Sequence, residues 1–423
     1  MTSSIPSREA KRAWAMLIAI TMLTTAGMTV VLPVLPFVVL RYVEDQSHLA
    51  VWVGVLEAIN ALCAFLAAPL LGRLSDRYGR RPIIIVAAFG AAVGYALFGI
   101  GGALWMLVVG RIVQGITAGD LPALFAYLAD ITPPEQRARR FGVLGALSGV
   151  GTMIGPAAGG LLAAVDVDLP VFVTAGIALV IAVLSLVALP ESLTPERRLT
   201  TLTLSGLHPV KVFTQAFGRP ALRPLLIGFV LVTIPFTFFV NNFSVLGLDT
   251  IGWNATAIGL LTASVGIVDI AIQGALLGVL LPRLGERGVI VSGIVAQGIG
   301  IVGLAMVGSL LAEPWLFVVG TLALAAGQGA ATATMDGVLS NAVGDDEQGW
   351  IAGTTQSLNA AIGMIAPLAA GFLYAGVAHS APYWLGAVMM AAAAVVITRG
   401  MRSASSEAGT AQPAPVRTGS ERA

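Results

Sequence analysis

The chain has 423 residues, of which 57% are apolar and only 11% are charged, whereas soluble domains carry about 25% charged residues. The formal net charge of +1 argues against a nucleic-acid partner, and the single cysteine, Cys63, excludes a disulfide within the chain. This composition predicts an integral membrane protein.

Long stretches of the chain contain no Asp, Glu, Lys or Arg, for example from Ala13 to Leu40 and from Gly349 to Thr398. A membrane-spanning helix needs roughly 20 apolar residues, and in hydrocarbon every backbone N–H and C=O must be satisfied within its own segment. In chain order, we predict transmembrane helices at 13–40, 51–72, 82–101, 104–130, 138–164, 169–189, 223–247, 254–281, 288–311, 314–340, 349–376 and 381–399.

The positive charges predict the orientation of these helices. All but two of the 23 Lys and Arg residues fall on one side of the predicted membrane, the exceptions being Arg41 and Arg111. Positively charged loops are retained in the cytoplasm, so we expect both termini there. The predicted parts are a cytoplasmic N-terminus (1–12), a first six-helix bundle (13–189), a cytoplasmic linker (190–222), a second six-helix bundle (223–400) and a disordered cytoplasmic tail (401–423).

An internal repeat relates the two predicted bundles. The loop from Gly72 to Arg81 reads GRLSDRYGRR, and the loop from Gly278 to Arg287 reads GVLLPRLGER. Two glycines and two arginines coincide at a constant offset. Near-parallel repeats of six helices, with a substrate site at their interface, are a transporter design.

The first of these loops resembles the signature loop of the major facilitator superfamily. Helix 4 carries GRIVQGITAG from Gly110, which resembles the family's helix-4 arginine motif and contains the polar residues Arg111 and Gln114. Helix 5 resembles the antiporter motif of the drug–proton efflux branch. The alternative is that the small residues on this face of helix 5 serve only for ordinary packing against a neighbouring helix. The antiporter motif consists of Gly151, Gly155, Pro156 and Gly159.

The resemblance covers most of the chain and is closest to the tetracycline–proton antiporters and their twelve-helix multidrug relatives. It implies an all-α fold of two pseudo-symmetric bundles, a place in the bacterial inner membrane, a monomer, and efflux driven by a proton gradient without a cofactor or metal. The tetracycline exporters carry acids in helices 1, 3 and 9 and a histidine in helix 8. Here these places hold Thr24, Gly94, Gln297 and Asp269, which weakens the case for tetracycline itself and leaves antiport open.

Ionisable residues within a span cost about 2.5–3.5 kcal/mol on insertion scales and are functional candidates. Asp269 and Asp120 lie deep in their helices with no arginine three or four residues away. Burial without a partner favours the protonated form of a carboxyl group. We predict that both take part in proton coupling; the alternative is a neutral acid hydrogen-bonded to a neighbouring helix.

Glu57 and Arg111 lie at equal depth in helices 2 and 4, which predicts an ion pair between these helices. The pair is structural by default and joins the proton coupling if protonation of Glu57 frees Arg111. Asn60 and Gln114 follow three residues later and therefore share the same faces.

The repeat also predicts a cytoplasmic gate, because an acid lies beside each arginine-rich loop. Salt bridges that must break on opening would act as a two-state latch, and a static loop anchor is the alternative. The predicted gate comprises Asp76, Arg77, Arg80, Asp130, Arg283, Arg287 and Asp336.

A cavity that mixes aromatic rings with amides would suit amphiphilic, including cationic, small molecules. Aromatic side chains that face lipid are the alternative. The predicted substrate cavity comprises Asn60, Phe236, Asn241, Asn242, Gln273, Gln328, Gln356 and Asn359.

The sequence has no nucleotide-binding loop, metal cluster or nucleophile–base constellation, so neither ATP-driven transport nor enzymatic catalysis is indicated. Proton-coupled efflux is the favoured function. An uptake carrier or facilitator for a native metabolite would share the fold and the loops. A lipid- or amphiphile-sensing membrane protein without active flux is a third hypothesis.

Overall fold

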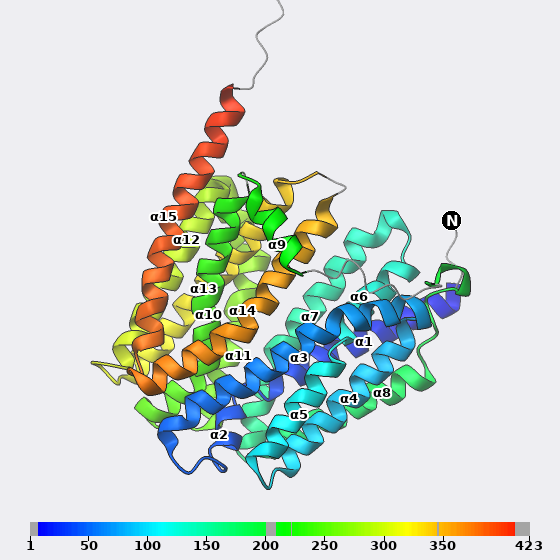
Figure 1. The fold of residues 1–423 in the computed structure, drawn as a ribbon, viewed down its shortest axis with the longest axis horizontal. Coiled ribbons are helices and arrows are strands. Elements are labelled where there is room, and N and C mark those ends of the chain that lie inside the picture. Colours follow the sequence, from blue (N-terminus) through cyan, green and yellow to red (C-terminus); the bar gives the residue numbers. More distant parts are fainter. Residues whose placement is uncertain (1–6, 200–208, 221, 345–346, 411–423) are drawn as a thin grey trace, which may run out of the picture.

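The regular structure of this protein is helical throughout the described chain (Figure 1). The computed structural model describes residues 7–199, 209–220, 222–344 and 347–410. Within these ranges, 11 helical segments are long and apolar enough to cross a membrane. An uncompensated backbone polar group cannot remain in hydrocarbon, so these apolar segments are helices.

The first half begins with a helix that is shorter than predicted. The expected span 13–40 ends as a helix at Val30, because Pro33 and Pro36 each remove a backbone donor. The helices of this half are α1 (Ser7–Val30), α2 (Leu35–Val39), α3 (Leu49–Tyr78), α4 (Arg80–Ile100), α5 (Leu104–Thr117), α6 (Asp120–Ile131), α7 (Pro134–Ala163) and α8 (Leu169–Val187), with a 3-10 turn η1 (Gln46–His48).

The linker and second half add a short 3-10 turn, two π-helical turns and seven α-helices. They are η2 (Pro195–Arg197), α9 (Pro209–Gly218), α10 (Arg223–Leu246), η3 (Gly247–Ile251), α11 (Ala255–Ala271), η4 (Ile272–Leu276), α12 (Leu277–Val307), α13 (Pro314–Asn341), α14 (Gln348–Gly376) and α15 (Ala381–Thr410).

The C-terminal helix is longer than the sequence analysis expected. α15 continues to Thr410, so residues 401–410 of the predicted disordered tail are helical. The first proline after this span is Pro413, so no proline stops the helix earlier. Residues 411–423 of that tail, residues 1–6 of the N-terminus and residues 200–208 of the linker lie outside the described chain.

A single helical segment of 53 residues runs from Ala255 to Val307. At about 1.5 Å per residue it is more than twice as long as a hydrocarbon core of about 30 Å. The segment changes direction at Gly285, whose φ of 67° and ψ of 168° are not helical. Gly79 makes a similar break between α3 and α4, with φ 111° and ψ 164°. Two glycines related by the sequence repeat therefore form similar turns, which only glycine adopts without strain.

Helices α1–α8 and α10–α15 form two groups that lie side by side (Figure 1). The groups touch mainly through two antiparallel pairs, α3 with α14 and α7 with α11, and also through a smaller contact of α3 with α10. A Cβ atom on Gly371 would lie 2.5 Å from the carbonyl oxygen of Ala50, and one on Gly160 would lie 2.9 Å from the Cα atom of Gly259. The backbones of the two groups are in direct contact at these points.

The same helix pairs separate toward the side on which α1 begins and α15 ends, here named the termini side (Figure 1). On α7, the space around Gly149, Gly145 and Gly142 is open, as is the space around Gly274 and Gly278 on the opposing helix. In the α3–α14 pair, Leu66 is 66% exposed. The two groups are therefore closed on the far side and parted on the termini side.

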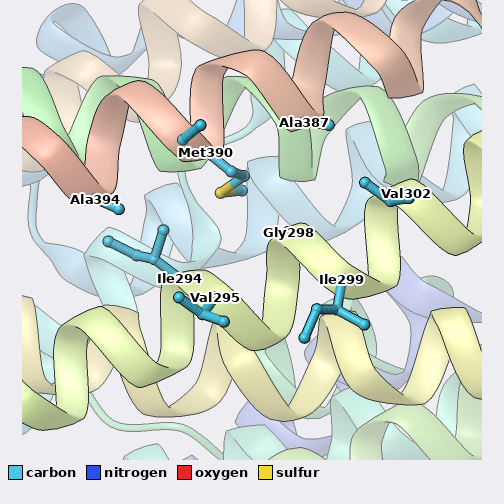
Figure 2. Close-up of a pocket in the computed structure, with 9 residues that line it drawn as sticks. Ile294, Val295, Gly298, Ile299, Val302, Ala387, Met390 and Ala394 are labelled. Carbon is cyan, nitrogen blue, oxygen red and sulfur yellow. The ribbon is translucent and has the colours of Figure 1, made fainter.

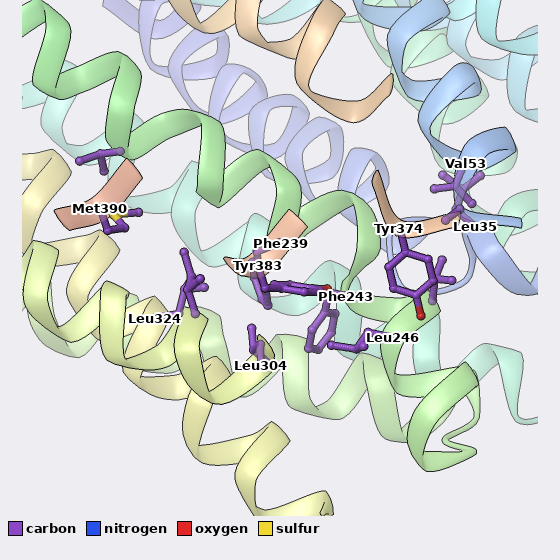
Figure 3. Packing of buried hydrophobic residues seen from close by; sticks show 14 of the residues in the cluster. Leu35, Val53, Phe239, Phe243, Leu246, Leu304, Leu324, Tyr374, Tyr383 and Met390 are labelled. Atoms are coloured by element: carbon purple, nitrogen blue, oxygen red, sulfur yellow. The ribbon is translucent and has the colours of Figure 1, made fainter. Parts of the chain in front are cut away.

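The largest buried cluster joins the two groups on the far side. Figure 3 shows Tyr374 of α14 next to Leu35 and Val53 of the first half. Deeper in the second half, the rings of Phe243 and Phe317 stack with their centroids 5.0 Å apart. Close packing over this wide area holds the far side shut.

Candidate functional site

Asp120 lies at a break in the predicted fourth span, where the structure has two helices instead of one. α5 ends at Thr117 and α6 begins at Asp120, with Gly119 at the N-cap. An acid in the first turn of a helix is stabilised by the unpaired backbone N–H groups there. This break separates Asp120 from the helix that carries Arg111.

A small cavity of about 30 Å³ inside the first group is lined by Asp120, Thr24 and Tyr95. The hydroxyl of Thr24 is buried and has no hydrogen-bond partner among the residues that the structure describes. A volume of this size can hold one water molecule when polar groups surround it. Asp120 and Thr24, on two different helices, thus border the same small cavity, whose other walls are mostly apolar.

Glu57 and Arg111 form the ion pair that the sequence predicts. The Nη2 atom of Arg111 donates a 2.8 Å hydrogen bond to Oε1 of Glu57, and its Nη1 atom donates one of 3.1 Å to Oε1 of Gln114. The ring of Phe98 lies 5.2 Å from the guanidinium carbon. Arg111 is only 5% exposed, so its positive charge has to be stabilised by these neighbouring side chains. The role of Glu57 in proton coupling stays a prediction.

Arg80 connects the first arginine-rich loop to the end of α6. Its guanidinium donates to Asp76 at 2.5 Å and to Asp130 at 3.2 Å, as the gate prediction anticipates for Arg80. Arg77 instead lies over the ring of Tyr78. The hydroxyl of Ser192 also donates to Asp130.

Sequence reasoning missed Glu191, which holds the same loop from the end of α8. Its carboxylate accepts hydrogen bonds from the backbone N–H groups of Arg80 and Arg81, at 2.9 and 3.2 Å. It also accepts from the N–H groups of Ser192 and Leu193. A carboxylate at this helix N-terminus satisfies donors that have no partner within α4.

The second arginine-rich loop lacks the corresponding contacts. Asp336 of α13 and the loop residues Arg283 and Arg287 form no ion pair within the described residues. In addition, Arg287 shares its helix face with Ile294, seven residues on, which faces α15. The prediction that these two arginines pair with Asp336 is therefore not met in this conformation.

The glycine face of α7 packs closely on α1. A Cβ atom on Gly151 would lie 2.7 Å from the carbonyl oxygen of Met22, and one on Gly155 would lie 2.5 Å from that of Ala26. Gly159 touches the carbonyl oxygen of Val30. The predicted close approach is thus present, and its partner is the first helix.

Asp269 lies at the level where α7 and α11 part. Three residues earlier, Gly266 still contacts Met153, whereas Gly149 on the termini side of that contact is open. Asp269 accepts hydrogen bonds of 2.9 and 2.8 Å from the amide of Gln273, which belongs to the π-helical turn η4. It also borders Gly329 of α13. The carboxylate therefore lies at the level of the parting, against α13 of its own group and with one amide partner.

The predicted substrate-cavity residues fall into two sets. Gln273, Gln356 and Asn359 are exposed, on the helices that part. Asn242 is fully buried and donates to the carbonyl oxygen of Ala370 across the second half. The other members are at least partly buried, namely Asn60, Phe236, Asn241 and Gln328.

A polar cluster on the far side was also missed by sequence reasoning. The hydroxyl of Tyr374 donates a 3.0 Å hydrogen bond to Asp249 at the end of η3. The ring of His379 stacks on that of Tyr374, with centroids 4.5 Å apart. No sequence spacing links Asp249 to Tyr374, which is 125 residues away, whereas His379 follows Tyr374 by five residues in the turn after α14.

No group of three or more His, Cys, Asp or Glu side chains that could hold a metal ion lies in the described part of the chain. The arrangement is two groups of membrane helices that meet on one side and part on the other, with the carboxylate of Asp269 at the level of the parting. This architecture defines a membrane transporter.

The Major Facilitator Superfamily model matches residues 17–310 and 236–420, and the chain belongs to this family. It is similar to the class C tetracycline resistance protein of Escherichia coli, with 34% identity over 89% of this chain and 92% of that protein. It is also similar to multidrug resistance protein 2 of Bacillus subtilis (strain 168), with 27% identity over 86% of this chain and 90% of that protein.

A crystal structure of a bacterial homologue of the human lysosomal transporter Spinster, in an inward-facing and occupied conformation, has a similar fold. Its TM-score is 0.73 at 16% identity, and the match covers 94% of this chain and 98% of that chain.

Proposed function

We propose that this protein exports small amphiphilic molecules across the bacterial inner membrane in exchange for protons. The observation that carries the proposal is Asp269, a membrane-embedded carboxylate at the level where the two helix groups part. The relatives named as tetracycline and multidrug resistance proteins support the export direction.

The proposed topology has twelve spans, with both termini in the cytoplasm. The turn at Gly285 supports a division of the 53-residue segment into two spans, which raises the count from 11 to an even number. The concentration of arginines on the termini side supports its cytoplasmic placement. The two bundles are then residues 13–189 and 223–400, joined by the linker 190–222.

With this orientation, the structure is in an inward-facing state. A substrate enters from the cytoplasm between the bundles and meets Asp269 together with Gln273, Gln356 and Asn359. A carboxylate and amides beside apolar walls suit an amphiphile with a cationic group. Rocking of one bundle against the other then opens the far side.

Proton exchange is assigned to Asp269 and Asp120. A carboxylate that binds a cation cannot hold its proton at the same time, so cytoplasmic substrate displaces a proton from Asp269 and a later proton displaces the substrate outside. Asp120 shares its cavity with Thr24, where one water molecule would connect its carboxyl group to a second polar group. Glu57 influences proton exchange in this half of the protein through its ion pair with Arg111.

The cytoplasmic gate is assigned to the Asp76–Arg80–Asp130 network together with Asp336 and Arg283 of the second half. In the present conformation the first-half network is complete, and the second-half residues have no ion-pair partner among the described residues. Closure of the cytoplasmic side would bring the two loops together. New ion pairs across the bundles would then latch that state.

The test uses everted membrane vesicles from an efflux-deficient bacterial host that carry a proton gradient, acid inside. A panel of amphiphilic drugs is added to vesicles with the wild-type protein and with Asp269→Asn. Export predicts drug-dependent proton release from wild-type vesicles and lower drug susceptibility of the intact host. Drug accumulation in the intact cells would instead select an uptake carrier, and specific drug binding without flux would select a sensor.

A further inference from the structure

A groove of about 360 Å³ runs between α12 and α15 on the outside of the second half (Figure 2). Its walls are apolar and include Ile294, Val295 and Ile299 from α12 and Met390 from α15. Figure 2 shows these side chains around the space between the two helices. The groove lies in segments apolar enough to cross the membrane, so it faces lipid.

Small residues along the two helices create this groove. A Cβ atom on Gly298 would still lie 3.7 Å from Met390, and one on Gly386 would lie 3.4 Å from Ile301. These two contacts fix an antiparallel register between α12 and α15. Ile299 is 64% exposed and forms one rim of the groove. The floor is thus formed by small residues and the rims by larger side chains.

A cationic side chain, that of Arg287, stands at the termini end of the groove. Arg287 lies seven residues before Ile294, which places it on the groove face of α12. It is half-buried and has no ion-pair partner in the described chain. Arg399 of α15 reaches the same level, but it lies seven residues after Ala392 and so on another face of that helix than the groove. The carboxylate of Glu286 lies beside Arg287 but on the flank of this face.

We propose that this groove binds one phospholipid with an anionic headgroup. One acyl chain lies along the groove, and the headgroup phosphate is held by Arg287. Lipid tails are as apolar as the groove walls, so the groove selects an acyl chain by shape and Arg287 selects the headgroup by charge. This proposal does not depend on the direction or the coupling of transport.

A second copy of the chain is a poorer occupant than a lipid. Two copies related by a twofold axis along the membrane normal would face each other with the same surface. Arg287 of one copy and Arg287 of the other would then lie at one level and repel each other. A phosphate group at this level neutralises the same charges instead.

The test is native mass spectrometry of the purified full-length protein titrated with phosphatidylglycerol or phosphatidylcholine. The wild-type protein is expected to retain one phosphatidylglycerol at least tenfold more tightly than phosphatidylcholine. Arg287→Gln should remove this preference. Ala391→Phe fills the groove and should weaken both lipids, whereas Ala392→Phe, an exposed neighbour on another face of α15, should bind them like the wild type.

Equal retention of the two lipids by the wild-type protein would overturn the proposal. So would unchanged lipid binding by Ala391→Phe, which is independent of any folding defect in Arg287→Gln. A dimer that Ala391→Phe dissociates and that excludes phosphatidylglycerol would assign the groove to a second copy instead.

Discussion

Arg111 of α5 and Glu57 of α3 are joined by a 2.8 Å ion pair within the membrane-spanning part of the first bundle. The guanidinium is almost fully buried, whereas the side chain of Glu57 is 26% exposed. A buried charge that loses its partner is costly, so each residue determines the environment of the other.

We predict that Glu57→Gln lowers the free energy of unfolding by about 3 kcal/mol, at the lower end for buried pairs because Glu57 is partly exposed. The measurement is thermal or denaturant unfolding in detergent. The double variant Glu57→Gln with Arg111→Gln should recover part of the loss, since it leaves no unpaired charge. Additive losses in the double variant would show that the two side chains do not interact.

Gly155 of α7 is predicted to tolerate no side chain. Gly155→Val would push α7 away from the carbonyl oxygen of Ala26, at a cost of about 1–3 kcal/mol, and would also reduce transport. Gly149→Ala is the matched control on the same helix, where the space is open. It should leave stability unchanged or raise it by about 0.5–1 kcal/mol, because alanine favours helix. Equal effects of the two substitutions would disprove the packing argument.

Gly79 combines a positive φ with a contact to the carboxylate of Glu191. Gly79→Ala should therefore cost about 1–3 kcal/mol of stability, from backbone strain and from the disturbed cap of α4. Gly72→Ala, in the same sequence motif but inside α3 with no neighbour within 4 Å, should leave stability unchanged or raise it by about 0.5–1 kcal/mol. Unfolding measurements on both variants check this, and a silent Gly79→Ala would mean that the loop adopts another conformation.

The linker is attached to the second bundle by an ion pair outside the membrane-spanning segments. Arg219 donates hydrogen bonds of 2.7 and 2.6 Å to Glu347, and these bonds lower the pKa of the Glu347 carboxyl below its ordinary value. The contribution of this pair to the free energy of unfolding is fully present above the ordinary pKa of a glutamate. It is lost as the pH falls through the lowered pKa, when the carboxylate is protonated.

The indole of Trp350 reports on this pair, because the guanidinium carbon of Arg219 lies 4.3 Å from its ring. Acid titration of tryptophan fluorescence, corrected with Trp350→Phe, should show a transition below the ordinary glutamate pKa. The transition should be absent in Glu347→Gln. A transition that persists in this variant would have another origin.

Most of the helices could be predicted from the sequence, because the thickness of the hydrocarbon core requires long charge-free runs. The predicted and observed bounds agree closely for α8 and α13, for example. The break before Asp120 could not be predicted, since Gly119 alone is compatible with a continuous membrane helix. Equal depth sufficed to predict the pair of Glu57 and Arg111, because each side chain needs a partner in hydrocarbon.

The site residues that sequence reasoning missed depend on contacts between distant segments. Glu191 follows the end of α8 and looks like an ordinary loop acid, although its carboxylate caps α4. Asp249 and Tyr374 are 125 residues apart within the second bundle, and only the packing of the elements of that bundle brings them together. Such pairs are fixed by packing between separate elements of one half, which residue spacing within one helix does not encode.

The central claim is that Asp269 and Asp120 couple substrate export to proton entry. The most direct measurement compares two assays in proteoliposomes with a fluorescent amphiphilic cation such as ethidium. One assay measures uptake driven by a pH gradient, and the other measures exchange of labelled for unlabelled cation without a gradient. We predict that the wild type performs both. At least one of Asp269→Asn and Asp120→Asn should lose the gradient-driven uptake, and at least one of the two variants should retain exchange. Full gradient-driven uptake by both variants would contradict the account.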